Sequence, residues 1–180
     1  MIYMFFAEGF EETEALAPLD LLRRAALNVT TVGVGSKAVT GSHGITVITD
    51  ITDSELELSS DLEAVILPGG MPGTLNLDAC PAVHFALDTA NAKGAIIAAI
   101  CAAPMVLGKK GLLKGKEAIC YPGFEEHLTG AVISDKKVVR DGKTITAKGM
   151  GVAVEFGLEL VKALKDAETA QKIKTAIMAD

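Results

Sequence analysis

The sequence predicts an α/β fold, in which a mostly parallel β-sheet is covered by helices on both faces. Three observations support this fold class. Short apolar runs alternate with longer amphipathic segments, which is the pattern of β-α-β units. Some runs, such as Ala95 to Ile100, are apolar throughout, as in strands that are buried on both faces. Hydrophobic residues make up 49% of the 180 residues, enough for one well-covered core.

The first half of the chain contains the alternating elements. A further helix begins near Ala103, since Pro104 suits the first turn of a helix. We expect strands and helices, in order, at Ile2–Ala7 (strand), Glu12–Ala26 (helix), Val29–Val34, Ile45–Thr49 and Ala64–Leu67 (strands), Pro81–Ala92 (helix) and Ala95–Ile100 (strand).

The second half begins with four short strands, at Ala118–Tyr121, Ala131–Ile133, Lys137–Arg140 and Thr144–Ala147. Asp141-Gly142 is a hairpin signal between the last two strands, so we expect a small antiparallel excursion beside the sheet. A closing helix carries Phe156, Leu160, Val161 and Leu164 on one face, and a final helix is expected over Ala167–Met178. Because no linker or repeat divides the chain, we expect a single domain over residues 1–180.

Composition narrows the function classes. The net charge is −6 and the basic residues are scattered, which argues against a nucleic-acid binder or a polybasic membrane anchor. The apolar start of the chain lacks the features of a signal peptide and is too short to span a bilayer, so we expect a cytoplasmic protein that acts on small molecules or on other proteins. Three cysteines without zinc-site spacing predict neither disulfides nor a metal site. The segment Gly33–Lys37 lacks the Walker A pattern, and we expect no cofactor.

Cys101 is the strongest candidate for chemistry. It stands where a buried strand turns into a helix, the position at which α/β hydrolases expose their nucleophile. A helix N-terminus favours the thiolate over the thiol. The alternative is a buried cysteine that packs as a small hydrophobic residue, which is how we interpret Cys80 and Cys120.

An acidic loop follows the first strand and leads into the first helix. The carboxyl ends of parallel strands meet at one edge of the sheet, so this loop and Cys101 are expected to face one crevice. Glu8, Glu11 and Glu12 are interpreted as solubility and helix-dipole residues. Glu14 lies one turn inside the helix beside apolar positions, where partial burial raises a carboxyl pKa.

Backbone donors and histidines complete the candidates. In Leu67-Pro68-Gly69-Gly70, the Gly70 N–H can approach a reacting oxygen, with the Ala102 N–H as a second donor, although a tight turn is the commoner use of Gly-Gly. His43 and His127 lie on connections that can reach a cleft. Gly149-Met150-Gly151 can bind an anion but is more typical of a flexible joint.

Three ordered motifs, EGFEETEAL, LPGGMPG and AAICAAP, give the chain a specific resemblance. From Ile2 to Leu164 it resembles the DJ-1/PfpI/ThiJ superfamily, in the branch of the parkinsonism-associated deglycase and its bacterial relatives. The resemblance implies a homodimeric, flavodoxin-like three-layer sandwich with an oxidation-sensitive nucleophile at Cys101, a carboxyl partner at Glu14 and oxyanion donors at Gly70 and Ala102.

Two positions depart from the family pattern. Ala102 stands where the peptidase branch has a histidine, which argues against proteolysis. Tyr121-Pro122 stands where deglycase-type members commonly have His-Pro, so Tyr121 or, if its loop folds back, His127 is the auxiliary group.

The resemblance implies a cofactor-independent glyoxalase or deglycase. Its substrates are small α-oxoaldehydes, such as methylglyoxal, or glycated adducts. The alternative is a redox-sensing or chaperone-like protein that acts through oxidation of Cys101, as in a response to oxidative stress. The dimer is expected to pair through the first helix, with its Leu16, Leu19 and Leu22, and to bring His43 near the partner's site.

Overall fold

A seven-stranded sheet organises the structure, a computed structural model that describes residues 1–179; Asp180, the last residue of the expected domain, lies outside the described residues. The strand order is β10-β11-β7-β6-β1-β2-β5. All neighbours are parallel except β10 and β11, which confirms the predicted fold class. The strands are β1 (Ile2–Phe6), β2 (Val29–Gly33), β5 (Ile51–Thr52), β6 (Ala64–Leu67), β7 (Ile96–Ile100), β10 (Val138–Asp141) and β11 (Thr144–Ala147).

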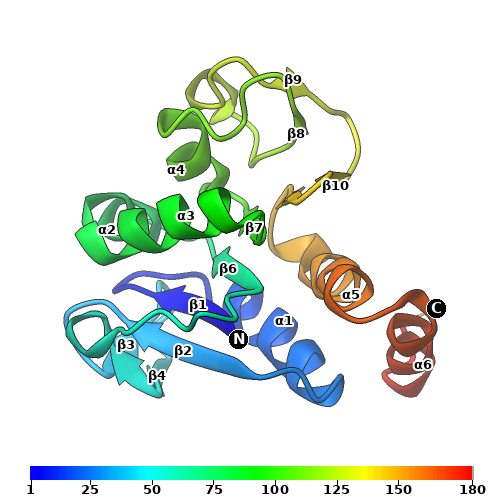
Figure 1. The fold of residues 1–180 in the computed structure, drawn as a ribbon, viewed down its shortest axis with the longest axis horizontal. Helices are drawn as coiled ribbons and strands as arrows, with labels where there is room; N and C mark the ends of the chain where they lie inside the picture. Colours follow the sequence, from blue (N-terminus) through cyan, green and yellow to red (C-terminus); the bar gives the residue numbers. More distant parts are fainter. Residues whose placement is uncertain (180) are drawn as a thin grey trace.

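Helices cover both faces of this sheet (Figure 1). Alternate side chains of β1 point to opposite faces, so Met4 and Phe6 join one core cluster and Tyr3 and Phe5 join the other. One face carries α1 (Glu12–Arg24), α5 (Ala153–Leu164) and α6 (Ala167–Ala176), and the other carries α2 (Gly73–Ala79), α3 (Pro81–Lys93) and α4 (Pro104–Lys109). None of the helices described over residues 1–179 is long and apolar enough to cross a membrane.

The segment Ile45–Thr49 does not join the parallel sheet as expected. Its central part, β4 (Thr46–Ile48), instead pairs antiparallel with β3 (Ala38–Thr40) in a separate hairpin. Thr46 and Ile48 are exposed and Val47 is half-buried, an alternation that suits a surface hairpin rather than a strand covered on both faces. The place beside β2 is taken by the short strand β5.

The expected antiparallel excursion is smaller than predicted. The Asp141-Gly142 hairpin forms, but Thr144–Ala147 (β11) is a parallel partner of β7 and belongs to the main sheet, which leaves β10 as the antiparallel strand. The strands β8 (Glu117–Ala118) and β9 (Val132–Ile133) pair parallel to each other outside that sheet. Helix α2 was not predicted, because its Gly73 start resembles a continuation of the preceding glycine-rich turn.

Helix α1 packs on α5, and this contact buries two of the three leucines that were expected to face a partner. Leu19 and Leu22 lie in the core and are 8% and 0% exposed, and Leu16 packs against the same cluster. A Cβ on Gly157 of α5 would lie 2.6 Å from Leu21 Cδ1 and 2.9 Å from Pro18 Cα, which shows how closely the two helices approach. Leu19 and Leu22 therefore stabilise the subunit itself and are not available to a partner, whereas Leu16 is only partly buried.

Candidate active site

Cys101 follows β7 directly and occupies a strained turn. Its φ is +64°, a left-handed conformation that is unfavourable for a residue with a Cβ. The backbone on both sides holds it there, because the Cys101 N–H donates to Ala147 O at 2.9 Å and its carbonyl accepts from the Tyr121 N–H at 2.8 Å. Its thiol is partly exposed, whereas Cys80 and Cys120 are buried. The strain and the exposure agree with a nucleophile at an elbow.

Glu14 meets this thiol from helix α1. The residue is only 1% exposed, and its carboxyl is hydrogen-bonded to Cys101. It also accepts hydrogen bonds from the Gly69 N–H, at 3.1 Å, and from the Met150 N–H. Glu11 caps the helix by accepting from the Glu14 N–H at 2.7 Å, which fixes the start of α1 beneath the site.

Two backbone N–H groups point at the Cys101 sulfur, and they come from the expected residues, Gly70 and Ala102. Gly70 has φ +91°, and a Cβ there would overlap the Glu11 nitrogen, so this approach requires glycine. The structure thus brings together four residues that lie far apart in the sequence: Glu14, Gly70, Cys101 and Ala102.

Burial controls the protonation of the Glu14–Cys101 pair. Burial raises the pKa of Glu14 to about 7, although the hydrogen bond from Cys101 opposes this rise. Burial, followed by the charge of Glu14, raises the pKa of the Cys101 thiol to about 12. The pair therefore loses one proton near neutrality, as expected for two acids that share a site.

The expectation that a helix N-terminus favours the Cys101 thiolate was wrong for the resting protein. Helix α4 begins only at Pro104, and it is six residues long. The two N–H donors lower the thiol pKa, but burial and the neighbouring carboxylate outweigh them. The carboxylate, rather than the helix, is in position to take the thiol proton.

A cavity of about 600 Å³ lies beside residues that neighbour the pair. The Tyr121 ring borders it, and Tyr121 is half exposed. A Cβ on Gly149 would lie 3.3 Å from that ring and 3.9 Å from Glu14 Oε1, so Gly149, which lines the cavity, lies next to the carboxyl. Its lining residues are Tyr121, Pro122, Lys137, Lys148, Gly149, Met150, Gly151 and Val152.

Sequence reasoning missed two donors to Glu14, the N–H groups of Gly69 and Met150. Gly149-Met150-Gly151 was interpreted as a flexible joint, yet Met150 supports the carboxyl. The position of the segment could have indicated this role, because it follows β11 at the sheet edge where β7 also ends.

The histidines lie elsewhere. His43 is on the β3–β4 hairpin and its Nδ1 lies 2.9 Å from Glu12 Oε2, while its backbone N–H donates to the same carboxyl at 2.7 Å. His127 lies in the short helix η2 (Glu125–His127), where its ring packs against Phe124. Neither histidine is among the contacts of Cys101 and Glu14 described above.

Glu12 also differs from expectation, since it is buried rather than a surface charge. It is 5% exposed and accepts hydrogen bonds from His43 and from the Ile45 N–H. Burial raises the pKa of Glu12, but these hydrogen bonds outweigh that effect and lower it to about 2. Donor atoms of Glu11, Glu12 and His43 lie within 4.8 Å of one another, and the Glu12 oxygens are already used to anchor the hairpin.

Known proteins share this sequence and fold. A family model described as the DJ-1/PfpI family matches residues 1–163. Protein dj-1beta of Drosophila melanogaster is 35% identical over 178 residues, which cover 97% of this chain and 95% of that protein. The glutathione-independent glyoxalase DJR-1.2 of Caenorhabditis elegans is 31% identical over 168 residues, covering 92% and 89%.

A solved structure agrees with these matches. Oxidized DJ-1 of Toxoplasma gondii superposes with a TM-score of 0.93 at 34% identity, over 98% of this chain and 97% of that one. The family model spans both the acidic loop and the Cys101 elbow, and the fold matches over nearly the whole length. The chain belongs to the DJ-1/PfpI family.

Proposed function

We propose that the protein is a cofactor-independent glyoxalase or deglycase that acts on small α-oxoaldehydes or their adducts. The observation that carries the proposal is the hydrogen-bonded pair of the buried Glu14 carboxyl and the partly exposed Cys101 thiol, with a carboxyl pKa of about 7 and two N–H groups at the sulfur. A carboxyl of this pKa both accepts and donates protons at neutral pH. The glyoxalase name of the Caenorhabditis elegans relative supports the same reaction.

The first step forms a carbon–sulfur bond. The Glu14 carboxylate takes the thiol proton as the sulfur attacks the aldehyde carbon of methylglyoxal. The oxygen that becomes negative receives hydrogen bonds from Gly70 and Ala102, whose N–H groups already lie at the sulfur. Glu14 then returns its proton to that oxygen, which gives a hemithioacetal and restores the carboxylate.

The second step moves hydrogen between the two adjacent carbons. Glu14 removes the proton from the former aldehyde carbon, the electron pair forms an enediolate, and Glu14 delivers the proton to the neighbouring carbon. The hydroxyl proton of the first carbon passes to the oxygen of the second, so the product is a thioester with no external oxidant. Water then cleaves the thioester, which releases lactate and returns the thiol.

Formation of lactate from methylglyoxal without glutathione tests the proposal. We expect turnover in the wild type and none in Cys101→Ser. Cys80→Ser is the matched control, because Cys80 is buried on the α2–α3 side and makes no contact with Glu14 described here. Wild-type protein without lactate formation, or equal activity of Cys101→Ser, contradicts the proposal.

Redox sensing is the second candidate. Cys101 is the one cysteine of the three that is not buried, and the Toxoplasma gondii relative was solved in an oxidized form. Oxidation would add oxygen to the sulfur, where the N–H groups of Gly70 and Ala102 are available as donors. Turnover separates the candidates, since a sensor is modified once by peroxide but does not convert many equivalents of aldehyde.

We further propose a homodimer, in which exposed apolar residues near the start of α1 meet a second copy. Met150 and Val154 are 54% and 37% exposed, and both line a hollow together with Thr13 of α1. Light scattering at micromolar concentration is expected to give twice the 18.7 kDa chain mass, and Val154→Asp is expected to shift it toward the monomer. A monomeric wild type would contradict this assembly.

A further inference from the structure

The cavity beside the pair is larger than a three-carbon aldehyde requires. At about 600 Å³ it falls in the range of sites that bind considerably larger molecules. Two of its lining residues adjoin Glu14, since Gly149 lies next to the carboxyl and the Met150 N–H donates to it. Two lysines, Lys137 and Lys148, are also among its lining residues. A substrate with a longer tail would therefore extend from the sulfur toward these lysines.

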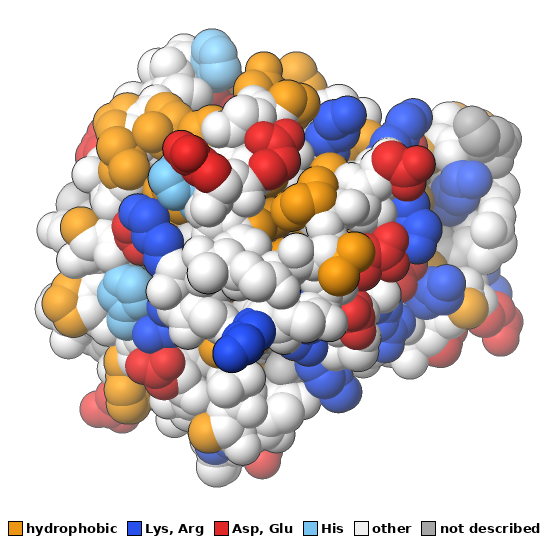
Figure 2. All heavy atoms as spheres, turned by 90° about the horizontal axis from the view of Figure 1, so that it is seen from above, with side chains coloured by type: hydrophobic (Ala, Val, Ile, Leu, Met, Phe, Trp, Pro, Cys, Tyr) orange, Lys and Arg blue, Asp and Glu red, His pale blue; other side chains and the backbone are white. Residues whose placement is uncertain are grey.

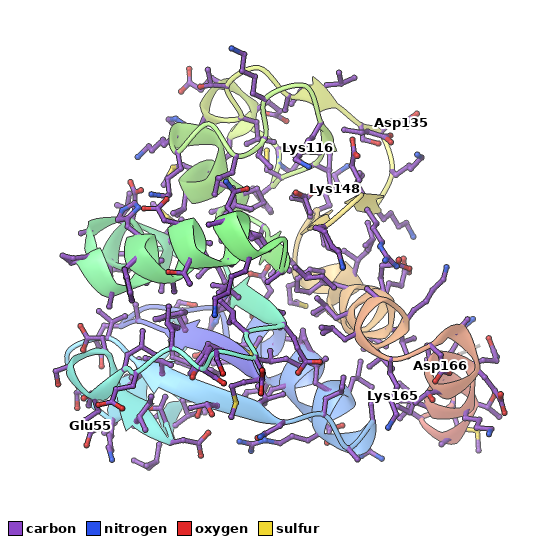
Figure 3. The ribbon with its side chains drawn as sticks, in the orientation of Figure 1. Glu55, Lys116, Asp135, Lys148, Lys165 and Asp166 are labelled. Atoms are coloured by element: carbon purple, nitrogen blue, oxygen red, sulfur yellow. The ribbon has the colours of Figure 1, made fainter. Side chains whose placement is uncertain are left out.

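Strand register fixes where the lysines stand relative to Cys101. Ala147 is paired with Ile100 in β7 and with Val138 in β10, so Cys101, Lys148 and Lys137 are neighbours across three adjacent strand ends. The Cys101 N–H donates to Ala147 O, and the Lys148 N–H donates to Lys137 O, both at 2.9 Å. Two strand spacings put the Lys137 backbone about 10 Å from that of Cys101. In Figure 3, Lys148 lies where the chain passes from the sheet toward α5.

Within residues 1–179, neither lysine has a side-chain hydrogen bond or an ion pair. Their neighbour Lys136 is paired with Glu117 at 3.0 Å, and Lys109 is paired with Asp78 at 2.6 Å. Figure 2 shows the same mixture elsewhere, with basic side chains interspersed among acidic ones. The two ammonium groups at the cavity are therefore available to a ligand.

We propose that Lys137 and Lys148 select α-oxoaldehydes that carry a carboxylate at the far end. This inference rests on the proposed function and names the substrate class of the same site. Glu14 and Cys101 act on the dicarbonyl end, as described above, while the lysines bind the carboxylate as an ion pair at an open surface. A suitable probe is 4,5-dioxopentanoate, whose dicarbonyl isomerises and takes up water to give 2-hydroxyglutarate, with the distal carboxylate unchanged.

The first measurement does not depend on turnover. 5-Bromo-4-oxopentanoate and its methyl ester alkylate the same sulfur but differ in charge at the far end of the molecule, so the ratio of their rates at Cys101 reports the preference of the site for a distal carboxylate. We expect Lys137→Gln and Lys148→Gln each to lower this ratio roughly 2- to 5-fold, as for an exposed ion pair, and the double variant to lower it about 10-fold. Lys143→Gln, at the turn end of the same hairpin, is the matched control and is expected to leave the ratio unchanged.

The second measurement compares kcat/KM for 4,5-dioxopentanoate with kcat/KM for methylglyoxal. We expect the double variant to lower this specificity ratio about 10-fold. An unchanged alkylation ratio in the double variant, or an unchanged specificity ratio in an active enzyme, would overturn the inference. If the wild type forms no lactate, the proposed function fails, and the alkylation ratio still decides whether the lysines recognise anions.

Discussion

Replacing Glu14 with glutamine tests the catalytic pair through stability as well as activity. The carboxyl is 1% exposed, and its pKa is raised from 4.5 to about 7. Below pH 4.5 the group is protonated in both the folded and the unfolded chain. Between pH 4.5 and 7 the unfolded chain ionises while the folded protein keeps the proton, so the free energy of unfolding falls as the pH rises.

The size of this effect follows from the shift. One pKa unit corresponds to about 1.4 kcal/mol, so the ionised Glu14 costs the folded protein about 3 kcal/mol above pH 7. Glutamine cannot ionise and avoids this cost. We therefore expect Glu14→Gln to be about as stable as the wild type at pH 4 and more stable at pH 8. For a chain of this length, 3 kcal/mol raises the melting temperature by about 6 to 12 °C.

Thermal unfolding of both proteins across this pH range measures the difference, because contributions from other groups cancel when the two are compared at the same pH. The same variant is expected to lose nearly all conversion of methylglyoxal to lactate, since glutamine cannot transfer the proton. A variant no more stable than the wild type at pH 8 would refute the raised pKa. A variant with most of its activity would refute the role of Glu14 as the proton carrier.

Three further predictions concern the neighbouring groups. Glu12→Gln is expected to lower the free energy of unfolding by roughly 1 to 2 kcal/mol at pH 7, because the pKa of Glu12 is lowered from 4.5 to about 2 in the folded protein. The stabilisation by the ionised Glu12 is lost only as the pH falls from 4.5 toward 2. The expected loss is smaller than the full pKa shift implies, because exposed His43 leaves the ion pair close to solvent. Urea unfolding measures it, and a stability difference independent of pH would contradict the lowered pKa. Mass spectrometry after limited iodoacetamide treatment is expected to find Cys101 modified first, because it is the partly exposed cysteine; earlier labelling of Cys80 or Cys120 would count against the assignment. Tyr121→Phe is expected to slow turnover several-fold, since the loss of one hydrogen bond raises the activation free energy by about 1 kcal/mol. His127→Ala is expected to slow turnover less than 2-fold. A 100-fold loss of turnover in His127→Ala would mean that the loop of His127 reaches the substrate.

The site could be predicted as far as its residues follow the ends of parallel strands. Cys101 comes directly after one buried strand and Gly70 three residues after another, and Glu14 lies in the first turn of the first helix, so topology alone places them at one edge. The raised pKa of Glu14 followed from its apolar neighbours. These inferences depend on local sequence and on a simple rule of fold geometry.

The remaining features depend on contacts that no local pattern encodes. Glu12 was interpreted as a surface charge because its partners, His43 and Ile45, lie more than thirty residues away on a hairpin that the sequence did not predict. The thiol pKa was expected to be low because the helix terminus was visible in the sequence, whereas the depth of burial was not. Both errors arise from desolvation and distant hydrogen bonds, which are set only when the chain is folded.

The glycines around the site determine which parts of it are open to redesign. The loops after β1 and β6 meet backbone to backbone, since the Glu11 N–H donates to Gly69 O at 2.9 Å, the Gly73 N–H donates to Gly9 O at 3.1 Å, and a Cβ at Gly70 would overlap Glu11. Any side chain added to these loops would displace the groups that perform the chemistry. The opposite wall carries the exposed side chain of Tyr121, so a library that seeks new substrates should vary this position and leave the loops untouched.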